Sequence, residues 1–381
     1  MFTYVQTMIN PMYEKYAQLV VNYSLNVKKG ERVFILSPAM AEELIRAIYV
    51  EVLKAGAHPY LDIGIEGTNE LLYKYASEEQ LLYHDDVHTY IYKEFDCFIL
   101  IKAEYNTKRF SLIDPIKIAK RQGSEKRKEQ QKIVWERESK GEFRICGYIP
   151  FPCNPFAQEA NMDLYSYVDF VSKAIFLDKE NPIQEWKNLE ENTQKFVDYI
   201  NKFEKIQVLG EDTDLKFSVK GRKWLNACGH YNLPDGEIYT SPVEDSVNGR
   251  IRFTYPGIRL GNEIENIYLE FKDGKVSTAT AQKGEDLLNE ILKVENANIM
   301  GEFAIGTNYG ITQFTKDMMF DEKIGGTIHC ALGRGFKKAG SKNESAIHWD
   351  MLKDMRVSGS KILANGEVIY EEGNWVIPDK S

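Results

Sequence analysis

The order of strand-like and helix-like segments in the first 150 residues constrains the fold of this chain more than any other sequence feature. A short apolar run at 32–37 is followed by a helical pattern of apolar residues over 44–53. Further strand-like runs lie at 59–64, 96–103 and 143–151. Strands that alternate with helices in this way are joined by right-handed crossovers and pair in parallel. The sequence therefore predicts an N-terminal α/β domain with a parallel sheet.

The pattern changes in the second half of the chain. Helical patterns at 69–83, 157–177 and 188–203 belong to the first half, whereas short runs of alternating polarity, interrupted by one helical pattern, dominate from residue 206 onward. Asn365-Gly366 is one of two hairpin turn signals among these runs. This alternation is typical of strands with one buried face. We therefore expect a β-rich C-terminal part with a mixed sheet.

The length of 381 residues suits two domains. We place an N-terminal α/β domain at 1–190 and a C-terminal catalytic domain at 191–381. The overall fold class is then α/β plus α+β. Hydrophobic residues make up 43% of the chain, enough to form a core in each domain.

Charge, cysteine content and hydropathy exclude several functions. Lys and Arg number 48 against 57 Asp and Glu, and the net charge of −9 argues against a general nucleic-acid binder. Five cysteines at wide spacing form neither a disulfide framework nor a structural zinc module. The apolar runs are far shorter than the ~20 residues of a membrane span. The opening residues lack the pattern of a secretory signal, so we expect a cytoplasmic protein that binds neither nucleic acid nor membranes.

The segment 115–140 departs from this acidic balance. It contains nine basic and four acidic residues, a local charge of +5. Such a segment forms either a patch for an anionic partner or a solvated helix face with ion pairs three and four residues apart. Because no aromatic residues are interleaved in a stacking pattern, the helix face is the favoured interpretation.

The histidines are the most informative chemistry-bearing residues, because the usual catalytic motifs are absent. His84 and His88 share a helical face beside two aspartates, but no third ligand lies near them, which favours a solvated helix end. His348 and Asp350 flank Trp349 on a predicted strand, so both would point to one face.

A second strand-like segment carries His329, a lone histidine between glycine-containing flanks. A buried core histidine is the ordinary explanation for such a residue. Together, however, His329, His348 and Asp350 form a set of two histidines and one carboxylate, which suits a divalent cation.

Two glutamates extend this candidate metal site. Glu237 follows a Leu-Pro-Asp-Gly turn, and Glu302 opens an apolar strand after Gly301. An unpaired charge in a buried strand is costly, so each needs a salt bridge, a cap or a metal. With both glutamates included, the set suits two divalent ions about 3.5–4 Å apart with a bridging carboxylate and a shared water.

Four segments, in this order, resemble the metal-site segments of the aminopeptidase T and aminopeptidase S family of metallo-aminopeptidases. They are LPDGEIYTSPVEDSVNG, GEFAIGTNYG, KIGGTIHCALGRG and KNESAIHWDM. The N-terminal segments YAQLVVNYSLNVKKGERVFI and VLKAGAHPYL extend the resemblance over nearly the whole chain.

The resemblance implies a dinuclear metal centre that hydrolyses the N-terminal peptide bond of peptides with a free N-terminus. Its ligands to two divalent ions, such as Zn, Co, Mn or Mg, would be Glu237, Glu302, His329, His348 and Asp350. Glu302 would bridge the ions and act as the catalytic residue that takes the proton of the water. The resemblance also implies a homodimer whose N-terminal domain contributes to dimerisation and restricts access.

Phe336 departs from the family pattern, which usually has a tyrosine at this position. The phenyl ring cannot donate a hydrogen bond to an oxyanion, and the loss of one such donor typically lowers rates ~10²–10³-fold. Arg334, Lys337 or Tyr309 are candidates to replace it.

Two alternative functions remain open from the sequence. A mononuclear iron(II) ring-cleaving dioxygenase needs only His329, His348 and Asp350. A weakly active or peptide-binding relative would follow from Phe336. Metal stoichiometry separates the first alternative, since a dioxygenase has no need for both Glu237 and Glu302.

Overall fold

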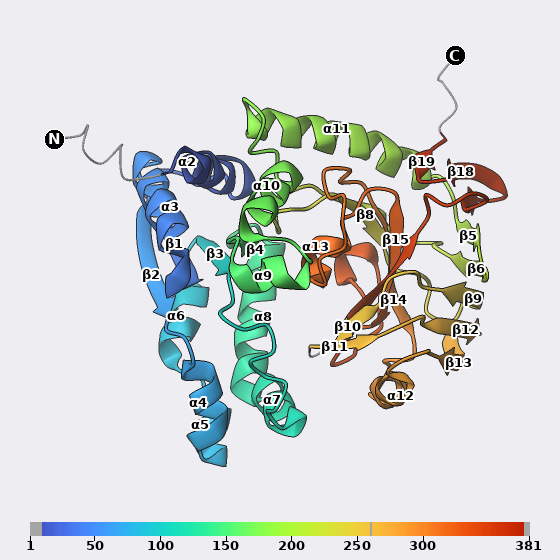
Figure 1. The fold of residues 1–381 in the computed structure, drawn as a ribbon, viewed down its shortest axis with the longest axis horizontal. Helices are drawn as coiled ribbons and strands as arrows, with labels where there is room; N and C mark the ends of the chain where they lie inside the picture. The colour runs from blue at the N-terminus through green and yellow to red at the C-terminus, as the bar shows by residue number, and fades with distance from the viewer. Residues whose placement is uncertain (1–9, 260, 377–381) are drawn as a thin grey trace. The chain divides into compact units, whose positions relative to one another are not determined.

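The computed structural model describes residues 10–259 and 261–376 (Figure 1). The chain divides into two compact units. Unit 1 comprises the chain up to Glu185 together with Gly229–Pro234, and unit 2 comprises Trp186–Cys228 and the chain from Asp235 onward. The predicted division at 190 and the division seen here both fall within one helix, α11 (Pro182–Ile200). The return of Gly229–Pro234 to unit 1 was not predicted from the sequence.

Unit 1 is built on a four-stranded sheet in the order β2-β1-β3-β4, and all of its strand pairs are parallel. The strands are β1 (Arg32–Pro38), β2 (His58–Gly64), β3 (Cys97–Lys102) and β4 (Arg144–Pro150). Phe34 on β1 forms an apolar cluster with Ile91, Phe95 and Phe143. The predicted parallel α/β sheet is therefore confirmed.

Helices surround this sheet, and two predicted helices are each broken in two. The segment 69–83 is interrupted where Ser77 forms a capping box that starts a new helix. The segment 157–177 is interrupted where Asn161 takes a positive φ of 55° and Asp163 caps the next helix. Unit 1 contains α2 (Pro11–Gln18), η1 (Leu19–Ser24), η2 (Ala39–Ala41), α3 (Glu42–Lys54), α4 (Thr68–Tyr75), α5 (Glu78–Leu82), α6 (Asp86–Glu94), α7 (Pro115–Gln122), α8 (Glu125–Ser139), α9 (Asn154–Glu159) and α10 (Leu164–Ala174).

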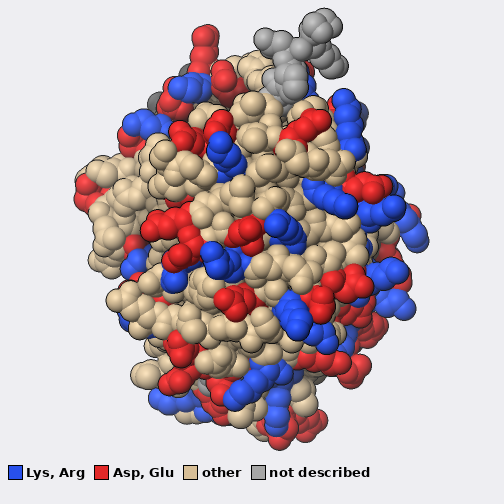
Figure 2. Space-filling model, turned by 90° about the vertical axis from the view of Figure 1, so that its right-hand side faces the viewer, with Lys and Arg blue, Asp and Glu red and all other residues tan. Residues whose placement is uncertain are grey.

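The basic segment 115–140 forms α7 and α8. Cations on α8 pair with acidic residues three or four positions away, as in Lys128–Glu125 at 2.7 Å and Lys132–Glu136 at 3.8 Å. These pairs agree with the predicted solvated helix face. Figure 2 views the molecule from another side, the right-hand side of Figure 1, where basic and acidic side chains are likewise interspersed.

Unit 2 contains an eight-stranded sheet and a five-stranded sheet. Their orders are β13-β12-β9-β6-β5-β17-β18-β19 and β16-β15-β14-β8-β7, and β10 and β11 form a separate hairpin. The pairs between these described strands are antiparallel. The sequence had led us to expect a mixed sheet, with parallel pairs as well as antiparallel ones. The fold class of α/β plus α+β is confirmed.

The strands of unit 2 are β5 (Lys205–Gly210), β6 (Thr213–Ser218), β7 (Leu225–Ala227), β8 (Glu237–Thr240), β9 (Asn248–Arg252), β10 (Gly257–Arg259), β11 (Asn262–Ile264), β12 (Tyr268–Lys272), β13 (Lys275–Thr280), β14 (Met300–Gly306), β15 (Thr327–Gly333), β16 (His348–Asp354), β17 (Lys361–Ala364), β18 (Glu367–Glu371) and β19 (Asn374–Trp375). The helices that begin in this unit are α12 (Glu285–Leu292), α13 (Met318–Asp321) and η3 (Lys337–Ala339).

One hydrophobic core joins the two sheets of unit 2. Val208 and Phe217 of the larger sheet lie in the same buried cluster as Phe303, Cys330 and Trp349 of the five-stranded sheet. The face of the five-stranded sheet that enters this cluster is called the core face below. Its opposite face carries the candidate site.

All five cysteines are buried and carry free thiols, in agreement with the absence of a disulfide framework. Within the described ranges, no helix has both the length and the apolar character needed to cross a bilayer.

Candidate metal centre

Strand register brings all five predicted site residues to one face of the five-stranded sheet. Directly paired residues of antiparallel strands point to the same side. Ala331 on β15 pairs with Asp350 on β16 and with Glu302 on β14, so both carboxylates share its face. This face is called the ligand face below.

The remaining residues reach the ligand face by the same rule. His348 pairs with Gly333, which lies two residues beyond Ala331 on β15. His329 lies two residues before Ala331, and it pairs with Ala304 of β14. Ala304 pairs in turn with Tyr239 of β8, so Glu237, two residues earlier, also lies on this face. Four adjacent strands thus supply the five side chains.

A β-bulge at Gly301 turns Glu302 onto the ligand face. Met300 pairs with Leu332 and lies in the hydrophobic core, whereas Glu302 pairs with Ala331. Without the extra residue, Met300 and Glu302 would share a face. A Cβ atom at Gly301 would lie 2.4 Å from the carbonyl oxygen of Gly333, so this bulge requires glycine.

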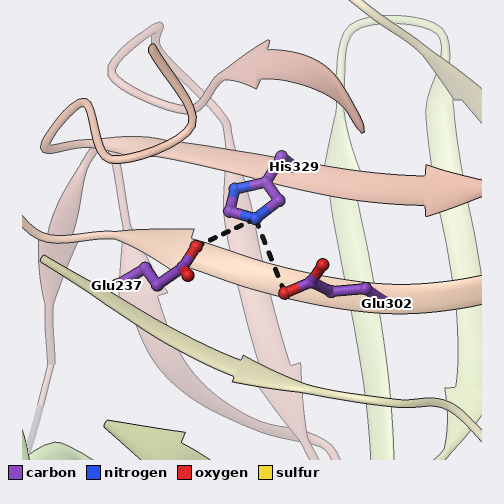
Figure 3. Close-up of side chains that lie close together, drawn as sticks. All are labelled: Glu237, Glu302 and His329. Carbon is purple, nitrogen blue, oxygen red and sulfur yellow. Dashed lines mark ion pairs between the residues drawn. The ribbon is translucent and has the colours of Figure 1, made fainter. Parts of the chain in front are cut away.

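The five side chains form two overlapping groups. In the first, His329 Nε2 lies 3.1 Å from Glu237 Oε2 and 3.8 Å from Glu302 Oε1 (Figure 3). In the second, His348 Nε2 lies 2.9 Å from Glu302 Oε2 and 3.5 Å from Asp350 Oδ1. Each group has one ligand atom per residue within 4.8 Å of the others. Glu302 belongs to both groups and turns one oxygen toward each.

Several buried ligand atoms make no hydrogen bond within the protein. They are Glu237 Oε2, Asp350 Oδ1 and both ring nitrogens of His329. The short distances of His329 to the carboxylates are those of ion pairs, without hydrogen-bond geometry. A buried polar atom left in this state is costly. Imidazole nitrogens and carboxylate oxygens directed toward one another fit a divalent cation, which would satisfy them together.

The orientation of His348 is fixed from its other side. Its Nδ1 lies 2.6 Å from the carbonyl oxygen of Arg334, to which an Nδ1–H donates. That hydrogen bond directs Nε2 toward Glu302 and Asp350, where it can hold either a proton or a metal ion. A backbone carbonyl that orients a histidine in this way is a common partner of metal-binding imidazoles.

Three charged residues of the site were not predicted from the sequence. Lys323 is fully buried, and its Nζ pairs with Glu237 Oε1, with Glu322 Oε1 at 2.7 Å and with Asp235 Oδ1 at 3.7 Å. Glu322 also forms a compact group with His329 and Asp350. The signal available in the sequence was weak, because Asp235 and Lys323 simply stand at the edges of apolar segments.

The electrostatics of the site favour positive charge. Burial alone would raise the pKa of Glu237, but Lys323 and His329 outweigh it and lower this pKa to about 2. Burial would lower the pKa of His329, but Glu237 and Glu302 raise it well above its usual value. Burial raises the pKa of Glu322 to about 8 despite Lys323. The carboxylates therefore stabilise cations here, and divalent ions can supply the charge that protons supply in their absence.

Phe336 lies directly against this site. Its ring centroid is 5.2 Å from that of His348, edge to face, and 5.0 Å from that of Tyr239. The position therefore borders the ligand face, but it offers no hydroxyl there.

The three candidate replacements for a hydroxyl at position 336 differ in their surroundings. Tyr309 donates its hydroxyl to the carbonyl oxygen of Gly373 at 2.6 Å. Lys337 pairs with Glu344 at 2.8 Å. Arg334 is exposed, and its contribution to the site is the backbone carbonyl that holds His348.

His84 and His88 have separate partners. His88 lies between Asp85 at 2.8 Å and Asp62 at 3.2 Å, whereas His84 Nε2 lies 3.2 Å from the carbonyl oxygen of Arg121. Neither belongs to a compact group of three metal-ligand residues among the described part of the chain. His84 precedes α6 and only His88 lies within it, so the two histidines do not share a helix face as expected from the sequence, although both lie near the N-terminal end of this helix.

A buried cluster of carboxylates and imidazoles on an antiparallel sheet is the chemistry of a metalloenzyme. The family described as thermophilic metalloprotease (M29) matches residues 9–375, nearly the whole chain. The chain belongs to this family. Membership implies a divalent metal cofactor and peptide substrates.

Similar proteins carry aminopeptidase names. Aminopeptidase 2 of Geobacillus stearothermophilus is 26% identical, with 95% of this chain and 97% of that protein covered. Aminopeptidase AmpS of Bacillus subtilis (strain 168) is 26% identical, with 94% and 97% covered. The solved structure of wild-type AmpT from Thermus thermophilus has a TM-score of 0.81 at 23% identity, with 96% and 99% of the two chains covered, and shares this fold.

Proposed function

We propose that this protein is a dinuclear metallo-aminopeptidase that hydrolyses the N-terminal peptide bond of peptides. The observation that carries this proposal is the pair of buried ligand groups that share Glu302. One ion would be held by Glu237, Glu302 and His329, and the other by Glu302, His348 and Asp350. When bound, the ions lower the pKa of a water and polarise a carbonyl.

Glu302 is suited to move the proton in this reaction. Its carboxylate lies where the two groups meet, so an oxygen not engaged by an ion would be placed to accept a proton from the attacking water and pass it to the leaving amine. The strand that carries Glu302 is buried between β15 and β8, which keeps the carboxylate in place.

Preference for a free N-terminus would come from the proposed metal ions. One ion could polarise the scissile carbonyl while also holding the free α-amine of the substrate, so a peptide whose amine is blocked would be a poor substrate.

A matched pair of substrates tests the proposal. The protein, stripped with a chelator and reloaded with Zn, Co, Mn or Mg in turn, is assayed on an aminoacyl-p-nitroanilide and on its N-acetyl derivative. We expect turnover of the free amine only, and two ions per chain by elemental analysis. Hydrolysis of neither compound by protein that holds two ions would contradict the proposal and favour the peptide-binding alternative.

The number of metal ions per chain distinguishes the dioxygenase alternative from the dinuclear peptidase. One tightly bound iron per chain and consumption of O₂ with a catechol would favour it. The shared carboxylate and membership in a metalloprotease family both support the dinuclear peptidase instead. We further propose that the protein is cytoplasmic and forms a homodimer, and that unit 1 contributes to dimerisation and restricts access to the site. Light scattering of the intact protein and of variants with altered surface residues on unit 1 tests the dimerisation.

A further inference from the structure

We propose that Tyr239 donates the hydrogen bond that stabilises the oxyanion formed during hydrolysis. This assignment rests on the proposed peptidase function. It concerns a residue of β8 that lies outside the five predicted ligands. Its ring lies beside the ring of Phe336, and only Tyr239 of these two residues has a hydroxyl group.

Register places Tyr239 on the ligand face. Tyr239 and His329 both pair with Ala304, one from each side, so the three residues form a row across three strands. Tyr239 also lies two residues after Glu237 on β8, and the residues of a strand two apart share a face. Ala304, at the centre of this row, has the smallest side chain of the three.

The surroundings of Tyr239 suit a hydrogen-bond donor to substrate. The side chain is half-buried, whereas its neighbours Ile238 and Thr240 on β8 are fully buried. Phe336 packs between Tyr239 and His348, at 5.0 and 5.2 Å between ring centroids. The backbone N–H of Phe336 donates to Ser241 Oγ at 3.1 Å, which ties this loop to the end of β8.

A donor of this kind would add to the charge stabilisation that bound metal ions provide. Attack of water on a peptide carbonyl turns the neutral oxygen into an oxyanion, and a preorganised donor that meets this charge stabilises the transition state more than the substrate. A phenol has one O–H to give, and it stays neutral near pH 7. Removal of the hydroxyl should therefore lower kcat and leave KM nearly unchanged.

Tyr239→Phe removes the hydroxyl and keeps the ring. We expect kcat on the aminoacyl-p-nitroanilide to fall about 10²–10³-fold, the usual loss for one oxyanion donor, with two ions still bound per chain. Calorimetry gives a second readout. The affinity for an α-aminoboronic acid, which becomes tetrahedral when it binds, should fall by a similar factor, whereas the affinity for the free amino acid product should not change.

Tyr268→Phe on β12 of the eight-stranded sheet is the matched control, because it makes the same chemical change at a tyrosine that donates to Glu270 Oε1 and belongs to the other sheet. Its kcat should stay within a few-fold of the wild type. In the Tyr239→Phe background, Phe336→Tyr returns a hydroxyl to the neighbouring ring, and a gain in kcat there supports the assignment. Wild-type kcat and wild-type boronate affinity in Tyr239→Phe would overturn it. A wild-type protein without turnover of any free peptide would instead overturn the proposed function.

Discussion

The two faces of the five-stranded sheet in unit 2 are built from neighbouring residues but have opposite chemistry. On β14, Phe303 enters the hydrophobic core and packs against Phe217 with ring centroids 4.9 Å apart. Its neighbour Glu302 lies on the ligand face between two histidines. The same alternation holds on β16, where Trp349 separates His348 from Asp350. The core face supplies stability, and the ligand face concentrates charge that destabilises the metal-free protein.

This division explains how a buried cluster of carboxylates can be tolerated. An unpaired buried charge costs free energy that the rest of the fold must offset. The side chains of the core face pack in one hydrophobic core with those of the eight-stranded sheet. Each strand that carries a proposed ligand is therefore anchored by apolar burial on its other side. The site can therefore hold its geometry even though it keeps several charged groups buried.

Glu302→Gln should have the largest effect, because this residue belongs to both ligand groups. We expect the bound metal to fall from two ions per chain toward none, and kcat to fall by at least about 10²–10⁴-fold, the share of a general base alone. Elemental analysis and the nitroanilide assay measure both. Glu367→Gln, an exposed glutamate of β18, is the control with the same chemical change. Retention of two ions in Glu302→Gln would show that the carboxylate does not bridge them.

Phe303→Ala changes the adjacent residue and should act on the other face. Loss of a buried phenyl ring typically costs about 3–5 kcal/mol of unfolding free energy, measured here by urea denaturation of metal-loaded protein. Below the unfolding transition, the metal content should remain at two ions per chain. A loss of metal from the folded variant would mean that the two faces are not independent.

Two buried lysines sharpen the comparison further. Lys323→Met leaves the carboxylates of Asp235, Glu237 and Glu322 without their cation, and should lower the stability of metal-free protein by about 3 kcal/mol. Lys353→Met removes hydrogen bonds to two backbone carbonyls and a cation near Glu211, Asp212 and Asp354, none of them a proposed ligand, at a cost of about 1–3 kcal/mol.

Saturating metal should offset part of the loss in Lys323→Met and leave the loss in Lys353→Met unchanged, because only the first lysine neutralises ligand carboxylates. Lys132→Met on the exposed face of α8 is the control and should stay within about 0.5 kcal/mol of the wild type. Equal responses of the two buried lysines to metal would contradict this account of Lys323.

The sequence was sufficient to place the proposed ligands on strands. The period of two residues puts His348 and Asp350 on one face whatever their partners are, and the glycines around His329 bound its strand. What could not be predicted was which strands pair. Glu237 and Asp350 lie more than 100 residues apart, and their proximity depends on pairings that no local pattern encodes.

Local side-chain chemistry accounts for most of the remaining differences. The breaks at Ser77 and Asp163 come from caps that compete with an otherwise continuous helical pattern. Lys323 was missed because a lysine is rarely buried, and its burial follows only from the carboxylates that the fold gathers around it. The resemblance to a known family supplied the two glutamates with a role that periodicity alone left open.

The path of the chain between the two units determines whether parts of this protein can be produced separately. Gly229–Pro234 belongs to unit 1, where the backbone N–H of Leu233 donates to the carbonyl oxygen of Tyr148 on β4 at 2.8 Å. Three residues after Pro234 stands Glu237. The chain thus passes between the units three times, and no single cut yields two complete modules. A fragment that begins at residue 191 would carry all five proposed ligands. It would also carry Gly229–Pro234 without β4, the strand to which this stretch is hydrogen-bonded in the intact chain. Gene fusion or module exchange with this protein must therefore keep both units together.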